Sequence, residues 1–331
     1  MKIIKKIFSL ILRVGISLAL LFFLLGKVDK KSLFGIIKNA DKFLLLLAFF
    51  VFSLVYLFGI WRWKMLLEAL DLRLPLKRII TSYGGGMFFS LFLPSTIGGD
   101  FMRTVDLAAY TKRPGEVMAT VLLDRLSGYI GLAILALCSL LFGLKIIEDR
   151  SVLLVLALII ALLIVVLLVL FNQFLYAKIN KLMHSPGSGR IRELLSNMHE
   201  EVHRFKHKRK IILKNLTLSF IIQLMSPLSF YIISLALGLK VNIVYFFIFL
   251  PIIGAITLLP ISIGGLGLRD ASTIFFFAKV GVAKDLAFAM SLLNFSFILA
   301  SGVIGGAVYV LTVRHRRLQH HPPSALRSAL L

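Results

Sequence analysis

Acidic residues and cysteine are scarce in this chain of 331 residues. It has 15 Asp and Glu against 38 Lys and Arg, a formal net charge of +23, and a single cysteine, Cys138. One cysteine cannot form a disulfide within the chain or a thiolate cluster for a metal. The sequence also has no P-loop, no G-x-S-x-G motif and no hydrophilic region large enough for a catalytic domain. We therefore expect no enzymatic activity, no cofactor and no metal site.

Charged residues of either sign are few, and apolar residues dominate. Hydrophobic residues make up 59% of the chain and charged residues 16%, whereas soluble domains have about 25% charged residues. Mean hydropathy is +0.95. The composition predicts an all-α polytopic membrane protein. Six stretches are long enough to cross about 30 Å of hydrocarbon, and they cover residues 8–25, 43–61, 117–143, 151–171, 212–238 and 286–311.

These stretches predict a single integral membrane domain over residues 1–313, with a basic tail at 314–331. A first half of about 1–171 and a second half of about 211–313 are joined by the hydrophilic loop 172–210. The segments predicted to be cytoplasmic carry more than twice as many Lys and Arg as the outer ones. By the positive-inside rule, both termini are expected to lie in the cytoplasm, and the protein in the cell membrane.

The excess of positive charge favours contact with anionic lipid headgroups at the cytoplasmic loops. A nucleic-acid partner is not expected, because no basic stretch alternates with aromatic residues in a water-exposed fold. The sequence from His199 to His203 matches H-E-x-x-H, a zinc-binding pattern. It lies in a strongly charged stretch without a third ligand, so we interpret it as a solvated segment beside the membrane.

Two shorter apolar segments, 79–93 and 243–259, are each followed by a copy of one motif. Both copies read L-P-x-x-I-G-G-x-x-x-R, and they begin at Leu93 and Leu259. Three expected spans separate them, and an odd number of spans reverses orientation. The sequence therefore predicts two oppositely oriented re-entrant hairpins in an inverted repeat, which is the architecture of many transporters with a binding site near the midplane.

Each motif has the residue types of an anion site. Proline ends the entering half-helix, and Gly-Gly allows a tight turn with exposed N–H groups. The returning half-helix then directs its positive end and an arginine toward the membrane interior, which suits a phosphate. Alternatively, Pro and Gly only permit close packing and the arginine reaches a headgroup. The candidate binding residues are Pro94, Ser95, Gly98, Gly99, Asp100 and Arg103 in the first copy, and Pro260, Ser262, Gly264, Gly265, Arg269 and Asp270 in the second.

Asp124 and Arg125 are two further candidates, because they lie inside an expected span. Charges at bilayer depth cost roughly 2.5–3.5 kcal/mol each on insertion scales, so they usually face a partner or a wet cavity. An ion pair with Asp100 or Arg103 and a contact with substrate are both open. Other polar residues within spans, Gln223, Ser229 and Asn294, predict hydrogen bonds between helices, and Gly302-x-x-x-Gly306 predicts a close helix contact within the chain, or a homodimer contact.

These motifs resemble the integral-membrane flippase domain of lysyl-phosphatidylglycerol synthases, which also occurs as stand-alone proteins. The resemblance rests on the two L-P-x-x-x-G-G segments, on the L-D-R sequence ending at Arg125, and on Arg62-Trp63. It implies movement of a lipid between leaflets. Aminoacyl transfer is not implied, because the separate domain that performs it has no counterpart here. Two departures are Asp270 in place of the usual Glu and Ser95 in place of a common Gly.

The functional hypothesis is a flippase for an anionic or phosphate-bearing lipid, including an aminoacylated or polyprenyl-linked one. Arg103 and Arg269 are expected to act together on one headgroup. The expected partners are membrane phospholipid or a lipid-linked substrate, with a second copy or a partner enzyme also open. The alternatives are a lipid-binding scaffold for an envelope-synthesis enzyme and a small-solute secondary transporter. Both transport hypotheses require a cavity near the midplane, and the scaffold does not.

Overall fold

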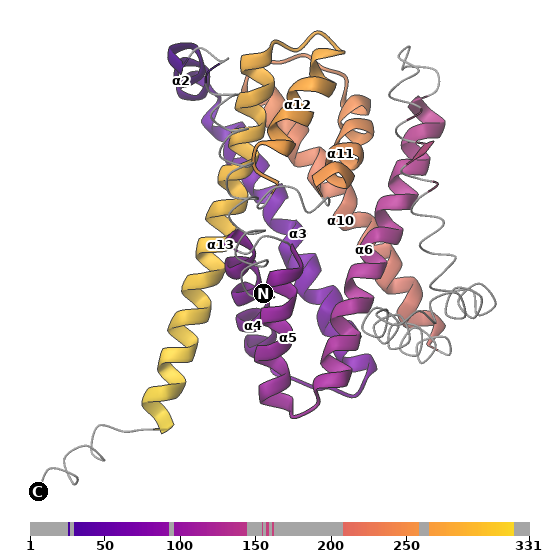
Figure 1. The fold of residues 1–331 in the computed structure, drawn as a ribbon, viewed down its shortest axis with the longest axis vertical. Helices are drawn as coiled ribbons and strands as arrows, with labels where there is room; N and C mark the ends of the chain where they lie inside the picture. Colours follow the sequence, from indigo (N-terminus) through magenta and orange to yellow (C-terminus); the bar gives the residue numbers. More distant parts are fainter. Residues whose placement is uncertain are drawn as a thin grey trace, which may run out of the picture.

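The computed structural model describes residues 30–92, 96–143, 208–257 and 265–320, together with a few isolated positions. Every element within these ranges is an α-helix (Figure 1). The helices are α2 (Lys30–Asn39), α3 (Lys42–Ala69), α4 (Leu76–Phe92), α5 (Thr96–Thr111), α6 (Pro114–Gly143), α10 (Arg209–Ala236), α11 (Ile243–Thr257), α12 (Leu268–Ala278) and α13 (Lys284–His320).

Four of the described helices, α3, α6, α10 and α13, are long and apolar enough to cross a membrane. Their surfaces carry large exposed apolar side chains such as Phe50, Leu57 and Ile304, which is typical of a surface that faces lipid. The prediction of an all-helical, multi-pass membrane protein is confirmed. The predicted spans at 8–25 and 151–171 lie almost entirely outside the described residues.

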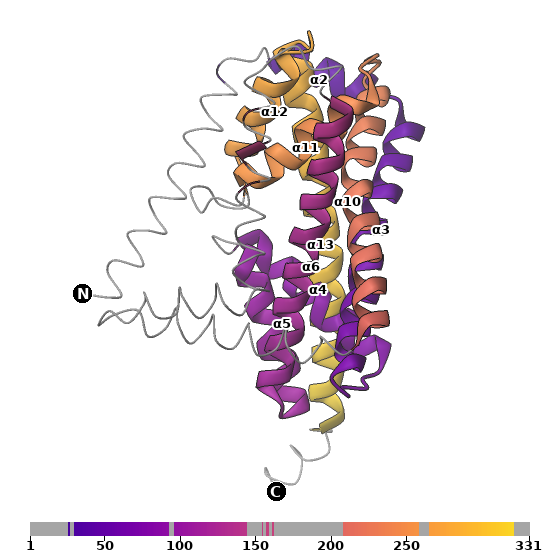
Figure 2. The ribbon, with the colours of Figure 1, turned by 90° about the vertical axis from the view of Figure 1, so that its right-hand side faces the viewer.

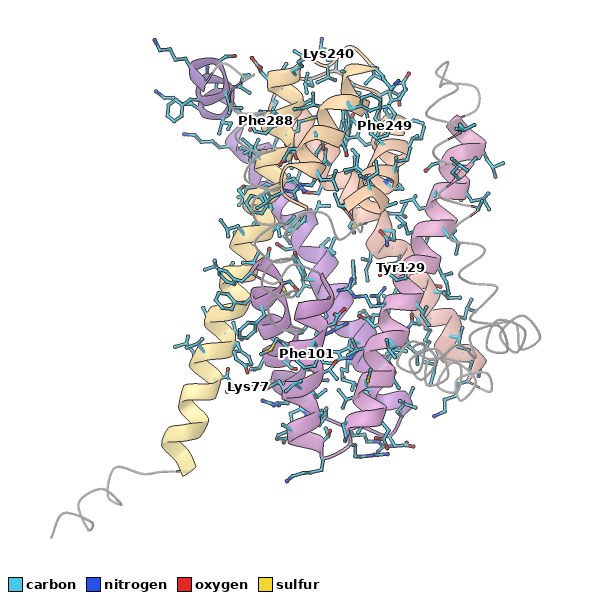
Figure 3. All side chains as sticks on the ribbon, in the orientation of Figure 1. Lys77, Phe101, Tyr129, Lys240, Phe249 and Phe288 are labelled. Carbon is cyan, nitrogen blue, oxygen red and sulfur yellow. The ribbon has the colours of Figure 1, made fainter. Side chains whose placement is uncertain are left out.

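The shorter helices form two pairs at opposite ends of the long axis. The pair of α4 and α5 lies at the end that carries Lys77, and the pair of α11 and α12 lies at the end that carries Lys240 (Figures 1 and 3). A view turned by 90° gives the same separation (Figure 2). The long helices run alongside the two pairs, and each pair occupies only part of the height of the molecule (Figure 1).

The packing of long on short helices crosses between the two halves of the chain. We use "first unit" for α3 to α6 and "second unit" for α10 to α13. Helix α13 of the second unit packs along α4 of the first, and α6 of the first packs along α11 of the second. Helices α3 and α10 pack together along their lengths. In each unit, one short helix (α4 or α11) therefore packs against a long helix of the other unit.

Glycines allow the closest of these contacts, between α4 and α13. A Cβ atom added at Gly84 would lie 2.9 Å from the carbonyl oxygen of Gly305, and one added at Gly305 would lie 2.8 Å from that of Gly84. Gly302 and Gly306 of α13 face Leu91 and Phe88 of α4 in the same way. The prediction that Gly302-x-x-x-Gly306 marks a helix contact within the chain is confirmed.

Replacing Gly305 with alanine is expected to destabilise the protein, because the added methyl group collides with backbone rather than with a flexible side chain. Overpacking of this kind costs about 1–3 kcal/mol, and a fall in melting temperature in detergent would measure it. The matched control is Gly35→Ala in α2, where an added Cβ has no neighbour within 4 Å. Equal melting temperatures for the two variants would contradict the proposed backbone contact.

Two helices extend beyond the predicted spans. Helix α3 continues to Ala69, so Arg62 lies within the helix, just beyond the predicted span at 43–61. Helix α13 continues into the predicted tail, as far as His320. Apolar runs mark the part of a helix that meets lipid, and they do not mark its end when the last turns pack on protein or extend into water.

Candidate functional site

A cavity of about 660 Å³ lies between the two units. Its lining comes from every described helix except α2 and α12, with Leu266 added from the turn before α12. Tyr129 of α6, one of its lining residues, lies midway along the molecule, between Phe101 and Phe249 of the two helix pairs (Figure 3). The volume is within the range of about 300–1,000 Å³ that is usual for small-molecule sites.

One side of the cavity carries five charged residues, which we call the ion-pair network. Arg62 Nε donates to Asp124 Oδ1 at 2.7 Å, and Arg103 Nη2 donates to Asp124 Oδ2 at 2.8 Å. Arg103 Nη2 also lies 3.0 Å from Asp100 Oδ1. Arg125 Nε donates to the other oxygen of Asp100. The network thus alternates cation and anion across α3, α5 and α6, and an arginine stands at each end.

Arg103 at the centre of the network is held by aromatic faces as well as by carboxylates. Its guanidinium carbon lies 4.8 Å from the centroid of the Trp63 ring and 5.3 Å from that of Tyr83. Trp63 is itself fixed, because its indole N–H donates to Thr120 Oγ1 at 3.1 Å. Arg103 is only 4% exposed. Cation–π contacts of this kind strengthen when they are desolvated, so the two rings and the two carboxylates together fix the guanidinium position, although Arg103 Nε is buried without a hydrogen-bond partner.

The other end of the network reaches the second unit. Arg62 Nη1 donates to Ser219 Oγ of α10 at 2.9 Å, and that hydroxyl donates to the carbonyl oxygen of Asn215 at 2.7 Å. Nearby, Gln223 Nε2 of α10 donates to the carbonyl oxygen of Gly128 in α6 at 3.0 Å. The predicted interhelical role of Gln223 is confirmed. These bonds fix α10 against the charged side of the cavity.

Asp124 and Arg125 form ion pairs, as the sequence predicts. Asp124 is 3% exposed and contacts Arg103, and Arg125 contacts Asp100. The two residues are adjacent on α6 but differ in burial, because the Arg125 side chain retains 34% of its exposure. Asp124 therefore depends on its partners more strongly than Arg125 does. Both residues line the cavity, and their predicted contact with substrate stays a prediction.

The first glycine pair agrees with the alternative prediction of close packing, and not with the prediction of a tight turn. Gly98 and Gly99 lie in the first turn of α5, not in the turn between the helices. A Cβ atom at Gly99 would lie 2.2 Å from the carbonyl oxygen of Gly86 in α4. The pair therefore lets the two short helices approach closely. Arg103 consequently lies about two turns into α5.

The second motif is closer to the prediction, and it differs from the first. Gly265 and Gly267 have φ angles of 75° and 77°, which favour glycine, so this motif does make a turn before α12. Asp270 accepts hydrogen bonds from the Gly267 N–H at 2.9 Å and from Ser291 Oγ at 2.5 Å. The predicted substrate residue Asp270 thus ties the start of α12 to α13 and is fully buried.

Arg269 does not occupy a position equivalent to that of Arg103. It lies in the first turn of α12, 8% exposed, with its Nε 4.0 Å from Asp270 Oδ1 and its guanidinium over the Phe295 ring at 5.1 Å. Arg269 is not among the lining residues of the cavity, whereas Phe295 is. Joint action of Arg103 and Arg269 on one headgroup stays a prediction.

Comparison of the sequence with known proteins identifies the family of this chain. The model of the family described as "Lysylphosphatidylglycerol synthase TM region" matches residues 10–306. The chain belongs to this family. It is also similar to the UPF0104 membrane protein PH1989 of Pyrococcus horikoshii, with 24% identity over 93% of this chain and 97% of that protein. The match to the lysylphosphatidylglycerol synthase TM region confirms the resemblance inferred from the sequence motifs, and it includes all the candidate residues.

Five candidate residues of this TM region lie outside the described residues. They are Pro94, Ser95, Pro260, Ser262 and Gly264. The H-E-x-x-H sequence at 199–203 also lies outside them. For all of these positions, the sequence predictions stand as they were made.

Residue-by-residue reasoning on the sequence did not assign Arg62 and Tyr83 to the site. Arg62 belongs to the family pattern, but the predicted span at 43–61 ends just before it. A signal was available, because an arginine in a long apolar helix needs an anionic partner, and Asp124 is an acid inside the next predicted span. Tyr83 carries no comparable signal. Its role follows from packing against Arg103, which a linear sequence does not reveal.

Proposed function

We propose that this protein moves a phosphate-bearing membrane lipid between the two leaflets, with the headgroup passing through the cavity. The observation that carries the proposal is that a buried ion-pair network lines a cavity between two units of the fold. The network supplies guanidinium groups for a phosphate. Apolar residues such as Val55, Leu132 and Leu250 also line the cavity and suit the start of the acyl chains.

The order of the helices supports this proposal. In each unit a long helix is followed by a pair of short helices and then by another long helix, and the short pairs lie at opposite ends of the molecule (Figure 1). We infer that the short pairs are re-entrant hairpins in an inverted repeat, with both termini in the cytoplasm. Inverted repeats allow alternating access by movement of one unit against the other. The crossed packing of α13 on α4 and of α6 on α11 couples the hairpins to such a movement.

The direct test is reconstitution of the purified protein in vesicles with fluorescent phospholipids and polyprenyl phosphates. Loss of fluorescence on addition of an impermeant quencher reports how much labelled lipid has reached the outer leaflet. Faster redistribution than in protein-free vesicles is expected. If lipids do not move but a water-soluble phosphate is taken up, the small-solute transporter is favoured. If neither moves, the scaffold is favoured.

Replacing Gly254 with leucine is expected to block translocation without unfolding the protein. Gly254 lines the cavity, and an added Cβ at this position has no neighbour within 4 Å, so the new side chain occupies cavity space. We expect the translocation rate to fall to a small fraction of the wild-type value at an unchanged melting temperature. Gly115→Leu is the matched control, because Gly115 has equally open surroundings away from the cavity. Wild-type rates in Gly254→Leu would argue that lipid takes another route.

A further inference from the structure

Arg269, in the first turn of α12, is a buried cation with unsatisfied hydrogen-bond donors. The residue is 8% exposed, and in the described part of the chain its Nε and Nη2 atoms have no hydrogen-bond partner. Its ion pair with Asp270 is long, at 4.0 Å, and both oxygens of that carboxylate already accept hydrogen bonds, from the Gly267 N–H and from Ser291 Oγ. A buried donor without a partner is costly, and more so on a charged group. Such a group in a folded protein calls for a specific explanation.

Two other buried arginines are held more closely than Arg269. Arg103 contacts Asp124 at 2.8 Å, and Arg78 contacts Asp106 at 2.9 Å. Each of these two arginines has an unpartnered Nε, but each keeps a carboxylate within hydrogen-bond distance. At Arg269 the unpartnered atoms are Nε and Nη2 together, which form one whole edge of the guanidinium. This edge is the fork that binds two oxygens of a carboxylate or a phosphate.

The position of Arg269 at the start of a helix also favours an anion. The positive end of the helix dipole lies at the first turn, and the arginine adds a positive charge there. Asp270 in the same turn offsets part of this charge. A phosphate bound at the free edge would accept the two unsatisfied hydrogen bonds and would interact favourably with the helix end.

Phe295 of α13 lies between Arg269 and the cavity. The guanidinium carbon of Arg269 is 5.1 Å from the centroid of the Phe295 ring. Phe295 lines the cavity, whereas Arg269 does not. The free edge of the arginine is thus one side chain away from the cavity, and an aromatic ring covers it. The ring attracts the cation, but it does not supply the two acceptor oxygens that the edge can bind.

We propose that the Nε–Nη2 edge of Arg269 is a second phosphate site, in the second unit, and that Phe295 is the gate between this site and the cavity. In the described conformation the ring closes the site, and a headgroup in the cavity meets Arg103 of the first unit. When the ring turns away, the phosphate passes to Arg269. This inference rests on the proposed function, because it concerns the headgroup in the same cavity.

Helix α13 links this gate to the first unit. It carries Phe295 and, about three turns further on, Gly305, whose backbone packs against Gly84 of α4. This contact leaves no room for a side chain, so α4 and α13 move together at this point. Alternating access requires one unit to move against the other. Such a movement would shift the Phe295 ring relative to Arg269 and would open or close the second site.

Replacing Arg269 with glutamine distinguishes a ligand site from a structural residue. Glutamine removes a buried charge and its unsatisfied donors, so the melting temperature in detergent is expected to stay the same or to rise. Arg78→Gln is the matched control, because Arg78 is as buried but has a close carboxylate partner, and its melting temperature is expected to fall. A fall in Arg269→Gln as large as in Arg78→Gln would show that Arg269 is a structural residue, and it would overturn the proposal.

Replacing Phe295 with alanine tests the gate. A site that is open about one-tenth of the time binds about tenfold more weakly than an open one, so Phe295→Ala is expected to bind phosphatidylglycerol up to about tenfold more tightly than the wild type. Binding is measured as the concentration-dependent rise in melting temperature of the detergent-purified protein. The gain is expected to vanish in the double variant Phe295→Ala/Arg269→Gln. Ile298→Ala is the matched control, because it removes apolar atoms from the same helix and the same cavity wall, and it should give no gain that depends on Arg269.

Three probes separate the phosphate from the rest of the lipid. They are phosphatidylglycerol, a diacylglycerol with the same acyl chains, and inorganic phosphate. The gain that depends on Arg269 is expected with phosphatidylglycerol and not with diacylglycerol. The same gain with inorganic phosphate alone would support the phosphate site and would make its ligand a water-soluble phosphate. An equal gain with diacylglycerol, or a gain that persists in the double variant, would overturn the proposal.

The outcomes also separate this inference from the proposed function. If Phe295→Ala gives the gain but no lipid is translocated in vesicles, the proposed function fails and the second site stands. If the wild-type protein translocates lipid but Phe295→Ala binds no more tightly than Ile298→Ala, the gate is overturned and the proposed function stands. If no probe binds to any variant and no lipid moves, both are overturned.

Discussion

Replacing Asp124 with alanine will destabilise the protein by roughly 3–5 kcal/mol, the usual cost of removing one partner of a buried ion pair. Asp124 is the carboxylate between Arg62 and Arg103, and each of its oxygens contacts one of them at 2.8 Å or less. Among the described contacts, its loss would leave Arg103 with Asp100 and Arg62 with the Ser219 hydroxyl. Because these two arginines are less than one-tenth exposed, water cannot replace the lost contacts.

The effect would be measured as loss of monodisperse protein after detergent extraction and as a lower melting temperature. The matched control is Glu116→Ala, which removes a carboxylate from the same helix. Glu116 pairs with the half-exposed Arg113, and exposed pairs contribute about 0–1 kcal/mol. Wild-type stability in Asp124→Ala would show that the network is not held together as the structure indicates.

Replacing Arg103 is expected to abolish lipid translocation almost completely. Arg103 lines the cavity, bridges Asp100 and Asp124, and lies over Trp63 and Tyr83. Alanine removes every one of these contacts. Lysine keeps the charge but loses the planar fork that can contact two carboxylates or a phosphate. We therefore expect partial translocation for Arg103→Lys and almost none for Arg103→Ala.

Folded yield must be measured beside translocation, because Arg103 is also a structural partner of Asp124. Arg78→Lys is a matched control, since Arg78 is also buried, pairs with Asp106, lies over the Tyr110 ring at 4.8 Å and does not line the cavity. The control is expected to lose stability without a specific loss of translocation. A well-folded Arg103→Ala protein that moves lipid at the wild-type rate would remove Arg103 from the transport mechanism.

The sequence predicted the positions of the short helices well, because they are set by local chemistry. The apolar segments expected at 79–93 and 243–259 correspond to α4 and α11, which end at Phe92 and Thr257. The length of each apolar segment and the Pro-Gly motif that follows it can be read directly from the sequence. The membrane class follows from composition in the same way, and the buried pairing of Asp124 follows from its place in an apolar span.

The details of the site depended on three-dimensional packing and could not be predicted in the same way. The two L-P-x-x-I-G-G motifs look equivalent, yet Gly99 contacts the backbone of α4 while Gly265 makes a turn. For the same reason Arg103 lines the cavity and Arg269 does not. Helix α5 begins within its motif and α12 begins after its glycine pair. The starting residue of each helix decides which way its arginine points, and contacts with distant helices determine that residue.

The crossed packing also has a consequence for the order in which the protein is made. The surface of α4 that carries Gly84 meets its partner at Gly305, which is synthesised near the end of the chain. At about 5–20 residues per second, the ribosome needs roughly 10–45 s to reach it. During this time the face of α4 that carries Gly84 lacks its contact with α13. A chain that stops before α13 would keep this face uncovered, so a truncated product would present a persistent signal for membrane quality control.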